Sequence, residues 1–303
     1  MILFFYRLLI NIIILFSPII ILIRILKKKE DPIRFIEKFS FPSRKRVNGK
    51  LLWFHGASVG EILSVIPLLK KLEKNKNIGH ILLTSNTLSS SKIFNNFYLK
   101  KTVHQFFPID SYFFTKRFLN YWNPAIAVFI DSEIWPNMIT YIKKKEIPLI
   151  LLNGRINKKS FNRWSSLGKI TKHLFSQFDI CYPSSQSSKV HLKKLGVKKI
   201  KLIGNLKFSE TKKDKFISDN KLKNVLASKN LWCASSTHPT EEKLIALAHK
   251  QIKIKYKDLI TIIIPRHVER TQSILGELKN LGLKIHLYSE KTHIKKKYRY
   301  FAC

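Results

Sequence analysis

The apolar residues of this chain alternate between two patterns. Short uninterrupted runs are followed by segments in which apolar residues recur at helical spacing. Runs that are apolar throughout are typical of strands buried on both faces of a sheet. After the run at 51–54, apolar side chains recur at Ile62, Leu63, Ile66 and Leu69, which is one buried face of a helix. Such alternation predicts an α/β fold with a parallel sheet between helices. The strands expected in this first region are 51–55, 80–84, 125–131, 148–153, 179–182 and 201–203.

A second and smaller set of alternating elements begins near residue 229. The strands expected there are 231–234, 259–264 and 283–287, and the helices are 239–256 and 271–281. We therefore predict an N-terminal anchor at 1–30, a first domain at 31–210, a linker at 211–228 and a second domain at 229–303. The tail after residue 295 has no helical or strand period. Because a doubly wound domain usually has more strands than this, we expect the second domain to be incomplete.

The N-terminal segment carries a membrane signal. The run from Leu8 to Ile23 contains no charged residue. It is flanked by Arg7 and Arg24, and a lysine cluster follows it. The uncharged run is short for a helix that crosses a bilayer, which needs roughly 20 apolar residues, and Pro18 lies inside it. We predict a monotopic or signal-anchor helix, with the rest of the chain on the cytoplasmic, positive side. The alternative is a helix buried in the protein core.

The charge balance favours anionic partners. The chain has 303 residues, with 56 Lys and Arg against 19 Asp and Glu and a formal net charge of +37. This excess favours phospholipid surfaces, phosphorylated sugars, nucleotides or nucleic acid, although AT-biased coding would produce the same composition. The three cysteines are far apart, which predicts a reducing compartment and no disulfide framework. The sequence contains no glycine-rich phosphate loop, no Cys/His metal motif and no nucleophile elbow.

One acidic residue lies at the start of the helix that follows the first expected strand. Gly56, Ser58 and Gly60 form a small-residue turn, and Glu61 follows in the first turn of the helix. In open α/β sheets this edge, outside the carboxyl ends of the strands, is where ligands bind. Ser58 and Gly60 would then support the site. The alternative is that Glu61 only interacts favourably with the helix dipole.

Further polar residues follow later strands of the first domain. Asp131 and Glu133 leave the strand expected at 125–131 and predict a polar pocket wall, or alternatively acidic caps ahead of Pro136. Arg155 could clamp a carboxylate or phosphate, or be a solvated loop cation. Near residue 204 a glycine permits a left-handed turn that would position Asn205 and Lys207.

The second domain offers a candidate anion site. Ser236, Thr237 and His238 join a strand to a helix, which Ser236 or Thr237 can cap. Pro265 and Arg266, followed by a histidine, end the next expected strand. Hydroxyl groups at a helix start, together with an arginine from a neighbouring strand end, suit a phosphate. The alternative is capping and solvation alone.

In this order, these segments resemble the Kdo transferases (3-deoxy-D-manno-octulosonic acid transferases) of Gram-negative lipopolysaccharide synthesis. The apolar N-terminus and its basic connector belong to the resemblance, which reaches to about residue 288. The matching motifs are His55-Gly56-Ala57-Ser58-Val59-Gly60-Glu61, Asp131-Ser132-Glu133-Ile134-Trp135-Pro136-Asn137, Asn153-Gly154-Arg155, Gly204-Asn205-Leu206-Lys207-Phe208, Ser235-Ser236-Thr237-His238 and Pro265-Arg266-His267.

The resemblance implies a GT-B fold, meaning two Rossmann-like domains facing a cleft. It implies transfer of Kdo from CMP-Kdo to a lipid A precursor (lipid IVA) by an inverting single displacement, without metal or cofactor. The enzyme would work at the cytoplasmic face of the cell inner membrane. The family's general base falls on Glu61, and its transition-state-stabilising residues fall on Asp131 and Lys207. Contacts to CMP fall on Pro265 and Arg266.

Two departures from the family pattern stand out. The family usually has Glu where this chain has Asp131, which draws the carboxylate back by about one methylene. The family also continues into a Gly-rich loop and a Gly-Gly-His-Asn segment, and neither occurs here. An alternative is therefore a remnant that binds only membrane and lipid acceptor. The apolar N-terminus argues against a nucleic-acid-binding protein.

Overall fold

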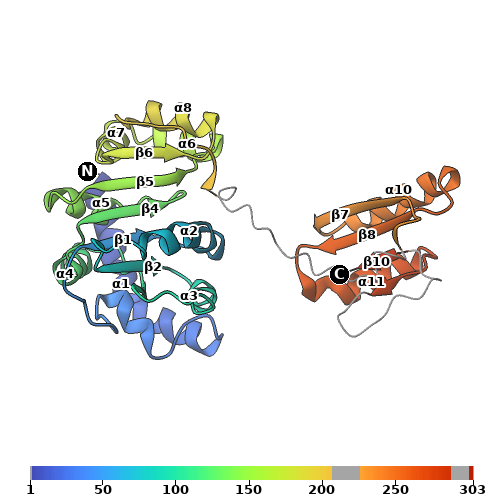
Figure 1. Ribbon diagram of the computed structural model, residues 1–303, viewed down its shortest axis with the longest axis horizontal. Coiled ribbons are helices and arrows are strands. Elements are labelled where there is room, and N and C mark those ends of the chain that lie inside the picture. The colour runs from blue at the N-terminus through green and yellow to red at the C-terminus, as the bar shows by residue number, and fades with distance from the viewer. Residues whose placement is uncertain (1, 207–225, 288–299, 303) are drawn as a thin grey trace. The chain divides into compact units, whose positions relative to one another are not determined.

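The structure is a computed structural model that describes residues 2–206, 226–287 and 300–302. The chain divides into two compact units, Met1–Thr211 and Lys212–Cys303, and each has a parallel sheet of its own (Figure 1). The prediction of an α/β fold with parallel sheets is confirmed.

The first unit follows the predicted alternation of strands and helices. Its strands are β1 (Leu51–His55), β2 (His80–Ser85), β3 (Thr102–Phe106), β4 (Ile126–Ile130), β5 (Leu149–Gly154) and β6 (Ile180–Pro183). Its helices are α1 (Ile2–Leu26), η1 (Arg34–Phe39), α2 (Val59–Leu72), α3 (Leu88–Phe94), α4 (Tyr112–Trp122), α5 (Pro136–Lys144), α6 (Lys158–Ser165), α7 (Lys169–Phe175) and α8 (Gln186–Leu195).

The strand order of this sheet is β3-β2-β1-β4-β5-β6, and every neighbouring pair is parallel. The chain moves outward from β1 in one direction and then returns to start again at β4. The connections therefore reverse between β1 and β4, and open α/β sheets bind ligands outside the strand ends at such a switch point.

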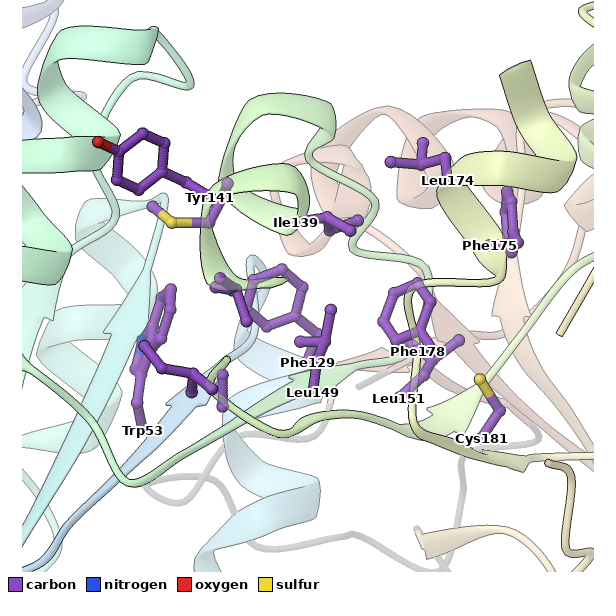
Figure 2. Packing of buried hydrophobic residues seen from close by; sticks show 14 of the residues in the cluster. Trp53, Phe129, Ile139, Tyr141, Leu149, Leu151, Leu174, Phe175, Phe178 and Cys181 are labelled. Atoms are coloured by element: carbon purple, nitrogen blue, oxygen red, sulfur yellow. The ribbon is translucent and has the colours of Figure 1, made fainter. Parts of the chain in front are cut away.

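Each face of the sheet has its own hydrophobic core. Trp53, Phe129 and Leu151 pack with helices α5 and α7 on one face, as Figure 2 shows. Their sequence neighbours Phe54 and Leu152 belong to the cluster on the other face, with α2. Successive side chains of a strand point to opposite faces, so a parallel strand covered on both sides must be apolar throughout. The uninterrupted apolar runs in the sequence have this origin.

Strand β3 has no hydrophobic signal, because Thr102, His104 and Gln105 are polar, yet all three are buried. The Thr102 hydroxyl donates to Glu73 at 2.8 Å, and the connector before β1 contacts His104 and Phe106. The Arg34 guanidinium donates to the backbone oxygen of His104 at 2.9 Å and pairs with Glu37, whose carboxylate accepts the N–H of Phe106 at 2.6 Å. The strand expected at 201–203 is wrong, since only an isolated bridge pairs Cys181 with Ile200 there.

Helix α1 lies along the first unit by one face. The side chains on this face are partly or fully buried and recur every three or four residues: Leu3, Tyr6, Ile10, Ile14, Ser17, Ile21 and Arg24. At one end Tyr6 donates to Asp110 at 2.7 Å and Arg7 to Asn137 at 3.0 Å, and at the other end Arg24 pairs with Glu30 at 3.0 Å.

The rest of the α1 surface is apolar and exposed, and 11% of its most apolar stretch is buried in the protein. A core helix would be mostly buried, so this exposure does not fit that alternative. Among the described residues, α1 alone is long and apolar enough to cross a membrane, by length and composition.

The second unit has a four-stranded parallel sheet of order β7-β8-β10-β9. A small core of Ala246, Ile263, Ile274 and Leu278 lies between sheet and helices. The elements are β7 (Leu231–Thr237), α10 (Glu241–Lys255), β8 (Ile260–Pro265), η3 (Val268–Arg270), α11 (Thr271–Asn280), β9 (His286–Leu287) and β10 (Tyr300–Ala302).

The C-terminal residues of the second unit form a strand that the sequence does not predict. Residues 300–302 form β10, which pairs with β8 on one side and β9 on the other. A strand of this length is too short to show a period, and it is defined by backbone hydrogen bonds to its neighbours. The strand expected at 283–287 is limited to its last two residues.

Candidate functional site

The switch point brings three predicted acids into one neighbourhood. Glu61 follows β1, whereas Asp131 and Glu133 follow β4, the strand beside it. Repulsion from the charges of Glu133 and Asp131 contributes to the raised pKa of Glu61. The sequence places these residues only at the ends of two strands; the strand order makes those ends adjacent.

Glu61 is held by the turn that precedes it. Its Oε2 accepts the N–H of Ala57 at 2.7 Å, and its Oε1 accepts the hydroxyl of Ser58 at 2.8 Å. Ser58 is also the N-cap of α2 and accepts the N–H of Glu61. A Cβ at Gly56 would lie 3.0 Å from the Cβ of Glu61, whereas one at Gly60 would have open space. A methyl group at position 56 would therefore press on the Glu61 side chain and shift its carboxylate.

The pKa of Glu61 is raised above its ordinary value, with burial as the largest cause. The like charges of Glu133 and Asp131 raise the pKa further, while the hydrogen bonds from Ser58 and Ala57 oppose the shift. No lysine or arginine stands among these causes for the part of the chain that the structure describes. A carboxyl group with this pKa holds a proton more readily than an exposed glutamate does, as a general base requires.

Glu133 is positioned by aromatic residues that sequence reasoning does not single out. Its Oε2 lies 3.2 Å from Nε2 of His55 and accepts the indole N–H of Trp135 at 2.8 Å. His55 is fully buried, lies 3.0 Å from the Thr84 hydroxyl and stacks on Phe107. The signal that could have identified His55 and Trp135 is their place inside the two motifs.

Asp131 and Asn153 end neighbouring strands in the same unusual backbone conformation. Their φ angles are +62° and +58°, in the left-handed region that Asp and Asn tolerate better than most residues. Asp131 accepts the N–H of Arg155 at 3.2 Å through its backbone oxygen. Non-glycine residues in this region often mark functional sites. The left-handed turn expected at Gly204 is present, with a φ of +92°.

Three further predicted residues lie at this edge of the sheet. Asp131, Arg155 and Asn205 line one cavity of about 360 Å³. The Arg155 side chain is exposed, while Asn205 is partly buried. Lys207 lies outside the described residues.

In the second unit the predicted residues meet at two neighbouring strand ends. Thr237 at the end of β7 pairs with Pro265 at the end of β8, and the N–H of Arg266 donates to the Thr237 backbone oxygen at 3.1 Å. A register shift between β7 and β8 occurs at Ser236, whose φ is +60°. Ser236, His238 and Arg266 are exposed, whereas Thr237 is buried.

The expected capping of the following helix is wrong. The N-cap of α10 is Thr240, which makes no side-chain capping hydrogen bond. The Thr237 hydroxyl instead donates to Glu242 at 2.7 Å, and Arg270 donates to the other oxygen of Glu242 at 2.9 Å. β7 continues to Thr237, beyond its expected end, which leaves both hydroxyls ahead of the helix.

Comparison with known proteins identifies the family. The family model described as 3-deoxy-D-manno-octulosonic-acid transferase (kdotransferase) matches residues 33–210. The chain belongs to the Kdo transferase family. The matched residues include the turn at Glu61, the loop at Asp131 and the Arg155 segment.

Curated Kdo transferases match most of the chain. A 3-deoxy-D-manno-octulosonic acid transferase of Rickettsia bellii is 36% identical over 261 residues, which are 85% of this chain and 62% of the relative. A probable mitochondrial Kdo transferase of Arabidopsis thaliana is 34% identical over 267 residues, or 85% of this chain and 59% of that protein. The chain therefore spans about three-fifths of the length of these relatives.

Solved structures show the fold. A UDP-GlcNAc 2-epimerase from Neisseria meningitidis, bound to UDP-GlcNAc, has a TM-score of 0.56 at 13% identity over 84% of this chain and 71% of its own. A related putative epimerase from Listeria monocytogenes has a TM-score of 0.54 at 15% identity, over 76% of this chain and 67% of its own. At these identities the likeness concerns the fold alone, which is of the expected GT-B type with two Rossmann-like units.

Proposed function

We propose that this Kdo transferase homologue is a glycosyltransferase that moves Kdo from CMP-Kdo to a lipid A precursor, lipid IVA, in lipopolysaccharide core biosynthesis. The observation that carries the proposal is the Glu61 carboxylate. It lies at the switch point of the sheet, where burial and two neighbouring acids raise its pKa. Membership of the family supplies the reaction class.

In the proposed reaction Glu61 acts as the general base. An acceptor hydroxyl attacks the anomeric carbon of Kdo and passes its proton to Glu61, while the bond from that carbon to the CMP phosphate breaks and CMP leaves with the electron pair. Attack from the opposite side inverts the configuration, so no enzyme nucleophile is needed. Each Glu61 oxygen accepts one hydrogen bond from the turn, and a carboxylate oxygen has a second lone pair for the substrate.

The remaining site residues stabilise charge in this proposal. Asp131 faces the positive charge that develops at the anomeric carbon, and Lys207 faces the leaving phosphate. Pro265 and Arg266 contact CMP, and the exposed Ser236 and His238, with Thr237, form the neighbouring strand end. Ser58 holds Glu61, and Glu133 raises its pKa.

Helix α1 supports a place at the cytoplasmic face of the cell inner membrane. One face of α1 is attached to the protein at both ends and in the middle, while its outer face is apolar. A helix that lies along the protein in this way can dip its free side into one leaflet. The lipid acceptor would then reach the site from the membrane, and the net charge of +37 suits anionic lipid.

The test is a transfer assay with purified full-length chain in detergent, CMP-Kdo and lipid IVA. Glu61→Gln should lower the rate by about 10²- to 10⁴-fold, the usual contribution of a general base. Glu146→Gln is the matched control, because Glu146 is exposed in the loop between α5 and β5 and makes no side-chain contact among the described residues.

Equal loss of transfer in both variants would contradict the role of Glu61. If the unsubstituted chain binds lipid IVA but transfers nothing, the chain binds membrane and acceptor only. The exposed apolar face of α1 is the observation that favours this second function.

A further inference from the structure

The cavity beside Asp131 has no assigned ligand. Its volume is about 360 Å³, and its wall comes from the loops that follow β4, β5 and β6, which lie side by side in the sheet (Figure 1). This volume is within the usual range of small-molecule sites, roughly 300–1,000 Å³. The residues that matter here are Asp131, Asn153, Arg155, Ser187 and Asn205.

Asn153 presents a buried hydrogen-bond donor to this cavity. The residue is 3% exposed, and its side-chain oxygen accepts the N–H of Leu206 at 3.0 Å. That bond fixes the orientation of the amide, so the NH₂ group is the free half. It donates to no acceptor among the described residues, although the side chain lines the cavity. A bound acceptor group would give this donor a partner inside a site that is shielded from most solvent.

Two further positive features surround the same space. Helix α8 begins beside the cavity: Ser185 accepts the N–H of Ser188, while the N–H groups of Gln186 and Ser187 are the first two of the helix. Such groups have no partner within a helix and, with the helix dipole, favour anions. Arg155 adds a full charge at the cavity wall. An amide NH₂, a helix start and a guanidinium together form a site for an oxyanion.

The lining of the cavity also contains a residue of different chemistry. Asp131 is the acidic residue of the lining, and it would repel an anion placed against it. Its carboxylate can instead accept a hydrogen bond from a hydroxyl group. The cavity therefore suits a ligand that carries both an oxyanion and hydroxyl groups. Sugar acids and sugar phosphates have this pattern.

We propose that this cavity is a subsite for the oxyanion of a substrate sugar, either a carboxylate or a phosphate. The oxyanion accepts from Asn153, Arg155 and the start of α8, and a sugar hydroxyl donates to Asp131. This subsite rests on the proposed function, since it holds a substrate next to Glu61 and Asp131.

Equilibrium binding of two probes to the full-length chain in detergent tests the proposal. Free Kdo carries a carboxylate and glucosamine 1-phosphate carries a phosphate, so the pair distinguishes the two sources. Asn153→Asp keeps an oxygen for the N–H of Leu206 but replaces the free NH₂ by a negatively charged oxygen. We expect it to weaken binding of the cognate probe by about 10- to 100-fold, the effect of losing a hydrogen bond to a charged group.

Arg155→Gln is the second variant, because this exposed side chain can be changed without disturbing the fold, and we expect a loss of about 10-fold. Arg163→Gln is the matched control: it removes an exposed guanidinium that does not line the cavity, and binding should not change. Thermal unfolding of each variant establishes that it is folded.

The proposal is overturned if neither probe binds saturably to the unsubstituted chain, or if Arg155→Gln and folded Asn153→Asp bind both probes as tightly as the unsubstituted chain. The transfer assay separates this outcome from failure of the proposed function. Transfer that is lost in Glu61→Gln but unchanged in Asn153→Asp rejects the subsite and retains the enzyme. If a probe binds, binding is weakened by Asn153→Asp, and the chain transfers nothing, the subsite is retained and the proposed function is rejected.

Discussion

Each unit has a carboxylate in the first turn of the helix that follows its first strand, and the two carboxylates behave in opposite ways. In the first unit Glu61 contacts only the turn before it, and its pKa is raised, chiefly by burial. In the second unit burial also pushes the pKa of Glu242 upward, but the hydrogen bonds from Arg270 and Thr237 outweigh burial, and the pKa ends below its ordinary value.

The difference shows that a position at the start of a helix does not by itself decide whether the pKa of a carboxylate is raised or lowered. Arg270 neutralises Glu242 and ties the end of β7 to the start of α11, so Glu242 is a structural residue. Among the residues that the structure describes, the charged groups that shift the pKa of Glu61 are the acids Glu133 and Asp131. Of the two carboxylates, Glu61 has the raised pKa and therefore accepts a proton at higher pH than Glu242 does.

The largest effect on stability is expected from Glu242→Gln. The substitution leaves Arg270 without its charged partner. Breaking a buried pair costs about 3 kcal/mol at the low end, which applies here because the Arg270 side chain is 22% exposed. Glu61→Gln should change the free energy of unfolding by no more than about 1 kcal/mol, since it weakens two local hydrogen bonds and removes repulsion. Hydrogen exchange of the amides in β7 and α10, and separately in β1 and α2, measures each unit by itself.

Glu269→Gln is the control, because Glu269 is exposed and makes no side-chain contact among the described residues. If Glu61→Gln destabilises its unit as much as Glu242→Gln does, the distinction between a chemical and a structural carboxylate is wrong.

The next largest effect on stability is expected from Gly56→Ala. The new methyl group would lie 3.0 Å from the Cβ of Glu61, and such overpacking costs about 1–3 kcal/mol. Displacement of the carboxylate should also lower the transfer rate by at least about 10-fold. Gly276→Ala, in α11, has open space, so it should stabilise its helix by about 0.5–1 kcal/mol and leave transfer unchanged. Unchanged transfer by Gly56→Ala would show that the turn does not position Glu61.

The helix caps of the two units should also respond differently. Ser58→Ala removes a capping oxygen and should cost about 1 kcal/mol. Thr240, the N-cap of α10, makes no capping hydrogen bond and has a φ of +79°. Thr240→Gly should therefore stabilise its unit by about 0.5 kcal/mol. Denaturant unfolding followed by hydrogen exchange compares them, and a loss of stability in Thr240→Gly contradicts the expectation.

The smallest effect is a shift in the pH dependence of transfer. A general base must be deprotonated, so the rate falls as pH falls through the pKa of Glu61, which lies above the ordinary glutamate value. Glu133→Gln removes a like charge and should move this acid limb to lower pH. Ser58→Ala removes a hydrogen bond to the carboxylate and should move it to higher pH. Rate profiles against pH measure both shifts, and Glu146→Gln should move neither.

If Glu133→Gln and Ser58→Ala moved the acid limb in the same direction, the assignment of this limb to Glu61 would be wrong. Another titrating group would then control the rate.

The fold was predictable where burial is apolar and local. β1 has the expected bounds of 51–55, because every position of this central strand packs on one face of the sheet or the other. β3 was not predictable, because the partners of its buried polar groups lie far away in the sequence. Arg34 of the connector contacts His104, and Glu73 accepts from Thr102. β10 exists through pairing with β8 and β9, which no local pattern records.

The candidate site divides in the same way. Motifs in the sequence name Glu61, Asp131, Glu133 and Arg155, but His55 and Trp135 become meaningful only as partners of Glu133. The free NH₂ of Asn153 depends on a hydrogen bond from Leu206, 53 residues later. Contacts at such separation have no signature in one sequence.

The sequence by itself determined that the chain is α/β, that its N-terminus is an apolar helix, and which acids stand at strand ends. Periodicity and turn chemistry are local, so they can be read from neighbouring residues. Only the tertiary structure decided which strand ends are adjacent and which carboxylate has a cation beside it. Strand order and ion pairing join residues far apart in the chain, and these contacts separate the pKa of Glu61 from that of Glu242.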